Sequence, residues 1–151
     1  MTPASTKHHK VLLTPQDIMR LPYNPAPYRL YYGEETHQFG DLRLPTLNTS
    51  TYPLLIIIHG GCWTSSVANL HFMSPFADAF TQNGFATWNI EYRCIDNGGG
   101  WPGTFQDVAK AIDHISIIAP QYNLNLSRAI VIGHSSGGHL ALWEAARHKL
   151  A

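Results

Sequence analysis

The pattern with the clearest chemistry in this chain is Gly-His-Ser-Ser-Gly at residues 133–137. An apolar run precedes it, and a helical pattern rich in alanine and leucine follows. A serine in this context stands on a tight, strained turn with its hydroxyl oxygen exposed, and the glycines let neighbouring backbone approach. Ser136 is excluded as the central serine because position 134 is histidine, not glycine. Ser135 is therefore the candidate nucleophile; the alternatives are a glycine-rich structural turn or an anion-binding helix start.

A second glycine pattern, His-Gly-Gly-Cys-Trp at residues 59–63, follows a uniformly apolar run at 54–58. Acyl transfer builds negative charge on a carbonyl oxygen, and backbone N–H groups must already point at that oxygen. We expect one such donor from Ser136 and others from Gly61 or Cys62, which would form the oxyanion hole. A simple turn after a strand is the alternative. Cys62 itself lacks an activating partner, so the oxyanion role is favoured over a nucleophilic one.

Several side chains are expected to follow the carboxyl ends of strands, where ligands bind in open α/β sheets. We predict that His59, Trp63, Tyr92 and Trp101 contact the substrate, with packing at the rim of the site as the alternative. His59 and two histidines beside Ser135, at positions 134 and 139, are also candidate bases. A structural role is favoured for each, because a base must lie within hydrogen-bond reach of the hydroxyl.

The elements needed to position these residues alternate along the chain. Thr14, Pro15 and Asp17 mark a short helix start, whereas residues 1–13 are expected to be disordered or loosely held. The remaining predictions are an antiparallel hairpin (28–32 and 38–44), three buried strands (54–58, 85–92, 129–132) and three helices (69–83, 104–119, 137–149). This alternation predicts an α/β fold with a mostly parallel, doubly wound sheet.

Two acidic residues near these elements are expected to be structural. Glu91 would tie down a loop. Asp107 would complete a capping box with Thr104 at the start of the helix that ends before Pro120.

Composition limits the function further. Lys+Arg and Asp+Glu balance at 10 each among 151 residues, so no electrostatic footprint for nucleic acid or an anionic membrane is present. No signal peptide is visible and the longest aliphatic run is too short to span a bilayer, which makes the cytoplasm the expected compartment. The histidine and cysteine spacings match no metal motif, no cofactor is implied, and no disulfide is expected between Cys62 and Cys94.

Taken together, the motifs resemble the α/β-hydrolases of the esterase/lipase type, most closely the feruloyl-esterase-like and kynurenine-formamidase-like branch. The resemblance covers residues 28 to 150 and rests on the patterns at 59–63, 89–93, 101–102 and 133–139. It implies a serine hydrolase acting on a small-molecule ester or an amide or formamide carbonyl, with Ser135 as nucleophile and Gly61, Cys62 and Ser136 as oxyanion donors.

The resemblance also implies a half-domain. In hydrolases of this type the catalytic acid and histidine follow the serine, and only 16 residues follow Ser135. We therefore expect a lead segment (1–27) and the N-terminal half of a hydrolase domain (28–151), with the acid and histidine absent. Uncovered strand edges would promote self-association or binding of a complementing C-terminal half. A non-catalytic binding or assembly piece is the alternative function.

Overall fold

A computed structural model describes residues 12, 14–47 and 49–149 of the chain. The elements alternate as α/β units behind an N-terminal helix and hairpin. In chain order they are α1 (Pro15–Met19), β1 (Tyr28–Tyr31), β2 (Phe39–Arg43), β3 (Tyr52–Ile58), the 3₁₀ helix η1 (Leu70–Met73), α2 (Ser74–Gln82), β4 (Ala86–Ile90), α3 (Gly103–Asp113), α4 (Ile115–Tyr122), β5 (Leu124–Gly133), α5 (Ser136–Ala146) and the 3₁₀ helix η2 (Arg147–Lys149).

The five strands form one mixed sheet in the order β1-β2-β4-β3-β5. β1, β2 and β4 pair antiparallel, whereas β4, β3 and β5 pair parallel, so the predicted edge hairpin and the three parallel strands are confirmed. The register aligns Ile58 with both Ile90 and Gly133. The carboxyl ends of the three parallel strands therefore meet at one edge of the sheet, where the two glycine patterns begin.

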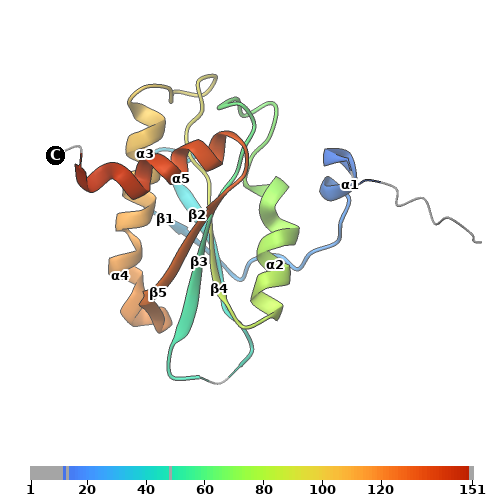
Figure 1. Ribbon diagram of the computed structural model, residues 1–151, viewed down its shortest axis with the longest axis vertical. Coiled ribbons are helices and arrows are strands. Elements are labelled where there is room, and N and C mark those ends of the chain that lie inside the picture. The colour runs from blue at the N-terminus through green and yellow to red at the C-terminus, as the bar shows by residue number, and fades with distance from the viewer. Residues whose placement is uncertain (1–11, 13, 48, 150–151) are drawn as a thin grey trace, which may run out of the picture.

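Helices cover both faces of the sheet, α2 on one face and α3, α4 and α5 on the other (Figure 1). Successive side chains of a strand point to opposite faces, so β3 supplies both cores. Leu54, Ile56 and Ile58 belong to the core with α3, α4 and α5, and Leu55 and Ile57 to the core beneath α2. Two-sided burial explains why this strand is apolar at every position from Leu54 to Ile58.

The start of the chain was partly predicted. The Thr14 hydroxyl accepts from the backbone N–H of Asp17, and the Asp17 carboxylate accepts from Thr14 N–H, so the predicted helix start is confirmed as a capping box. Asn24 donates to the Asp78 carboxylate and fastens this segment to α2. The expected disorder of residues 1–13 lies outside the described residues except at Leu12, and the domain boundary at residue 27 stays a prediction.

The prediction of one helix at 104–119 is wrong in three respects. The structure has two helices that meet at His114, α4 continues through Pro120 where the helix was expected to end, and no capping box begins α3. The Thr104 hydroxyl instead donates to the Arg93 carbonyl and accepts from Gly100 N–H. Asp107 is fully buried and bonded elsewhere, so neither side chain is free to cap a helix.

β5 is also longer than the 129–132 expected. Its first residues pair with the start of β3 across an irregularity between Pro53 and Leu54. No helix in the described part of the chain is long and apolar enough to cross a membrane.

Candidate active site

Ser135 occupies the turn between β5 and α5 in a backbone conformation that side chains rarely adopt, with φ 53° and ψ −119°. Such strain persists only where the surroundings enforce it, and it is concentrated at functional sites. The surroundings here are two close backbone contacts. A Cβ on Gly133 would overlap the backbone of Gly137, and a Cβ on Gly137 would overlap the backbone of Ile58 and His59. Glycine at these positions therefore lets β5, α5 and β3 come together around the turn.

The start of α5 presents an open backbone donor beside Ser135. The N–H groups of Gly137, Gly138 and His139 bond back to the carbonyls of His134 and Ser135. The N–H of Ser136 makes no hydrogen bond to any described residue. A helix N-terminus carries partial positive charge, so this N–H suits a developing oxyanion.

The loop after β3 lies against the same turn. A Cβ on Gly60 would lie 2.6 Å from the His134 carbonyl oxygen and 3.1 Å from the Ser135 Cβ, which places this part of the loop directly beside the serine. Gly61, Cys62 and Trp63 follow with φ values of 116°, 53° and 58°. Within the described residues, the N–H groups of Gly61 and Cys62 donate to no other group. The loop is therefore a strained turn with unused donors, next to the strained serine.

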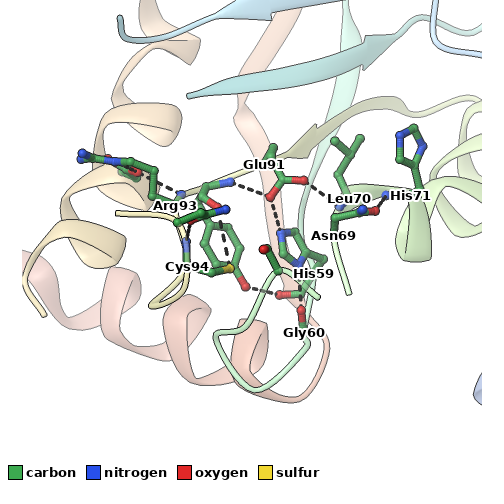
Figure 2. Close-up of polar contacts among 12 residues, drawn as sticks. His59, Gly60, Asn69, Leu70, His71, Glu91, Arg93 and Cys94 are labelled. Atoms are coloured by element: carbon green, nitrogen blue, oxygen red, sulfur yellow. Dashed lines mark hydrogen bonds and ion pairs between the residues drawn. The ribbon is translucent and has the colours of Figure 1, made fainter. Parts of the chain in front are cut away.

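A buried polar network connects the start of this loop to the residues that follow β4 and to η1 (Figure 2). Glu91 follows β4 directly, and its carboxylate accepts from His59 Nε2 at 2.9 Å and from the backbone N–H of Leu70 at 3.1 Å. It also accepts from Tyr92 N–H at 3.0 Å. Burial by itself raises the pKa of Glu91, but the hydrogen bond and charge of His59 and the two backbone N–H groups hold the pKa below its ordinary value. Glu91 thus ties the loop to η1, the structural role predicted for it.

Two of the predicted substrate contacts lie in the interior. The side chains of His59 and Tyr92 are fully buried, and their rings stack with centroids 4.2 Å apart. The Tyr92 hydroxyl donates to the His59 carbonyl at 2.7 Å. Both rings are covered by protein, so in this structure they do not lie on a surface that a substrate could contact. His59 and Tyr92 therefore support the loop after β3, and the predicted substrate contact is not found for either.

The other two, Trp63 and Trp101, line an apolar pocket of about 210 Å³. Sequence reasoning missed the aromatic ring that completes this pocket, Phe105 on α3. Its spacing in the sequence indicates only a core-facing helical residue. Phe105 packs against Trp101 and also against His139, one helical turn after Ser135. The pocket therefore lies beside α5, and Trp101 remains 78% exposed at its rim.

A second buried network anchors the loop that carries Trp101. Arg93 donates from Nε and Nη2 to the Asp107 carboxylate at 2.8 Å each, and Gln38 Nε2 donates to the same group at 2.7 Å. Burial opposes the charge of Asp107, but these donors hold its pKa below the ordinary value. Asp107 therefore fixes a loop rather than capping a helix.

No described histidine is hydrogen-bonded to Ser135. The His134 ring packs on Phe72, with centroids 5.1 Å apart, and the His139 ring meets Trp63 edge-on at 5.7 Å. Both neighbours of the serine thus have packing roles in this structure. Among the described residues, no three histidine, cysteine, aspartate or glutamate side chains gather as a metal site requires.

The sheet order, the strained turn at Ser135 and the glycine loop beside it define the α/β-hydrolase class. A family model, BD-FAE, matches residues 41–150, and the chain belongs to the BD-FAE family.

Solved esterases share the fold. A bacterial heroin esterase is 28% identical with a TM-score of 0.66, and 75% of this chain covers 36% of that one. An inhibited esterase B from Lactobacillus rhamnosis is 26% identical with a TM-score of 0.71, at 78% and 38% coverage. An uncharacterized 31.7 kDa protein of Escherichia coli is 36% identical over 76 residues, which are 50% of this chain and 25% of that protein. The chain thus spans well under half the length of each of these relatives.

Proposed function

We propose that the protein is a serine hydrolase that cleaves a carboxylic ester, or an amide or formamide, of a small molecule. The observation that carries this proposal is the strained conformation of Ser135 beside backbone N–H groups that have no partner among the described residues. The esterase relatives support the reaction class. The choice between ester and amide rests on the resemblance and not on a contact in the site.

The mechanism follows from the placement of these groups. The Ser135 hydroxyl attacks the carbonyl carbon, and the N–H groups of Gly61, Cys62 and Ser136 stabilise the negative charge that develops on the carbonyl oxygen. The intermediate collapses to an acyl-enzyme as the C–O or C–N bond breaks and the alcohol or amine leaves with the proton taken from the serine. Water then attacks the acyl-enzyme, which releases the acid and restores the serine hydroxyl. Proton transfer is assigned to a histidine oriented by an aspartate or glutamate, which follow the serine in this class. Among the described residues, none is hydrogen-bonded to the serine in that role.

A phosphonate probe tests the nucleophile directly, and a tributyrin phosphonate has been captured with esterase B. We expect a fluorophosphonate to modify Ser135, as located by peptide mass spectrometry, and Ser135→Ala to abolish both labelling and turnover of p-nitrophenyl acetate. Ser116→Ala is a matched control, because Ser116 is an exposed serine whose hydroxyl donates to a backbone carbonyl. Labelling that survives Ser135→Ala, or that maps elsewhere, would overturn the assignment.

A second candidate function is favoured by β5. Within the described sheet, β5 pairs only with β3, and Leu126 and Ile130 on it are about half exposed. An unpaired edge of this kind is a template for another chain. The second candidate is therefore an assembly piece that associates with itself or with a complementing segment through β5. Sedimentation of the purified chain over a range of concentrations tests it, and a concentration-independent monomer would count against it.

A further inference from the structure

Both ring nitrogens of His59 face oxygen atoms that accept hydrogen bonds. Nδ1 lies 2.7 Å from the Gly60 carbonyl oxygen, and Nε2 lies 2.9 Å from Glu91 Oε1 (Figure 2). The ring is fully buried, so water supplies neither partner. A neutral imidazole carries one N–H, whereas the imidazolium carries two. The number of protons on the ring therefore decides how many of these two bonds can form.

The partners of His59 indicate two protons. A carbonyl oxygen only accepts, which requires a proton on Nδ1. Glu91 receives N–H groups from Leu70 and Tyr92 in addition to His59, and an ionised carboxylate accepts all three. A proton placed on Glu91 instead would weaken the bonds from these backbone donors. Glu91 is bonded to the His59 ring and Tyr92 stacks on it, and the Tyr92 hydroxyl is already committed to the His59 carbonyl.

The bond to Gly60 also sets the direction of the next N–H. The only cis peptide among the described residues joins Trp101 to Pro102, so the Gly60–Gly61 peptide is trans. In a trans peptide the C=O and the following N–H point in opposite directions. With the Gly60 carbonyl turned to the His59 ring, the Gly61 N–H points away from that ring. Gly60 itself lies against Ser135.

We propose that His59 is a positioning residue for the loop at residues 60–63, which carries the proposed oxyanion donors Gly61 and Cys62. Its doubly protonated ring, held by Glu91, fixes the Gly60 carbonyl and thereby aims the Gly61 N–H at the acyl oxygen of a substrate on Ser135. This role rests on the proposed function of Ser135. Loss of the ring proton or of the ring frees the Gly60 carbonyl, and the glycine pair permits the peptide to rotate.

The charge state is tested in the intact chain by NMR. In protein labelled with ¹⁵N-histidine, long-range ¹H–¹⁵N correlations near neutral pH should show a proton on both ring nitrogens of His59. The His59 signals are identified by their loss in His59→Asn. His148→Gln, which alters an exposed histidine on η2, should leave them unchanged. One bare ring nitrogen on His59 in the wild type would overturn the proposal.

Two double variants test the positioning. His59→Asn retains an N–H donor near the place of Nδ1, whereas His59→Leu has none, and each is combined with Glu91→Gln so that no carboxylate is buried without its cation. The ¹³C resonance of the Gly60 carbonyl and the Gly61 amide resonance should stay near their wild-type values with asparagine and move with leucine. Equal movement in both folded variants would overturn the proposal. Should both fail to fold, the wild-type ring spectrum decides.

Labelling rates separate this role from that of Ser135. The leucine variant should slow fluorophosphonate labelling by about tenfold or more, below the roughly 10²–10³ for loss of a whole oxyanion donor. The asparagine variant should recover most of the rate. Equal slowing in both would count against His59, whereas no labelling of the wild type would overturn the proposed function and leave the spectra to decide on His59.

Discussion

The strands on either side of β3 end at the same edge of the sheet but are fastened there in different ways. The end of β4 is held by side chains, through Glu91 with His59 and through Arg93 with Asp107. The end of β5 is held by backbone, where Gly133 and Gly137 allow contacts that no Cβ would permit. The β4 end depends on carboxylates and the groups that donate hydrogen bonds to them. The β5 end depends on glycines, which have no Cβ to block close backbone contact. The two ends should therefore respond to different perturbations.

The largest effect is expected at the β5 end. Gly137→Ala places a methyl group into the backbone of Ile58 and His59, which cannot rotate away as a side chain would. Overpacking typically costs about 1–3 kcal/mol, and a backbone obstacle puts this variant at about 3 kcal/mol or more. Urea unfolding followed by circular dichroism measures the loss.

The matched control for that variant is Gly103→Ala at the start of α3, where the nearest atom to a new Cβ is 3.8 Å away. It should be neutral or slightly stabilising. If the two alanine variants were equally stable, the close contact of Gly137 with the backbone of β3 would not be what stabilises the β5 end.

The next largest effect is expected at the β4 end. Asp107→Ala leaves Arg93 and Gln38 without their shared acceptor. Removing one partner of a buried pair costs about 3–5 kcal/mol, and the partial exposure of Arg93 places the loss near 3 kcal/mol. The control is Asp113→Ala, which breaks a surface pair with Arg147 and should cost about 0–1 kcal/mol. Similar losses in these two variants, measured by urea unfolding, would contradict the importance of burial.

Of the two strand ends, only the β4 end should be destabilised by acid, because it is the one held by carboxylates. The pKa values of Glu91 and Asp107 lie below their ordinary values of 4.5 and 3.8 in the folded chain. Their contribution to stability is therefore complete above those ordinary values and is lost as the pH falls through the folded-state values. The free energy of unfolding should fall as the pH drops below about 5, and Asp107→Asn should make this fall shallower. An unchanged slope in that variant would show that Asp107 is not one of the responsible groups.

Local patterns were sufficient to predict much of this edge. The hairpin, the three parallel strands and the turn at Ser135 each follow from a short run of residues whose alternation or glycines leave few other conformations. Glu91 was also correctly predicted to be structural. In contrast, the bonding of Asp107 depends on Gln38, which lies 69 residues away along the chain. No local pattern contains that information, and the capping box was inferred in its place.

Burial was the other quantity that the sequence could not supply. His59 and Tyr92 follow strand ends, which is where ligand contacts are found, and that position is equally compatible with the layer beneath a site. The break at His114 was also not predicted, and buried residues of both α3 and α4 belong to the same core cluster. The oxyanion and nucleophile assignments stay predictions, since they concern a reaction and not a contact.

The smallest effect is expected at the outer edge of β5. Ile130 is 52% exposed, and Lys in its place puts a charge on an unpaired edge, a device that blocks pairing with another strand. Ile130→Lys should weaken self-association by about tenfold, which corresponds to about 1.4 kcal/mol, while unfolding changes little. Tyr31→Lys on β1, the opposite edge strand, is the control, because Tyr31 is similarly exposed at 58%. Sedimentation velocity across a concentration series compares them. If both lysine variants reduced association equally, general charge repulsion would explain the result. The hypothesis that the chain associates through the edge of β5 would then be contradicted.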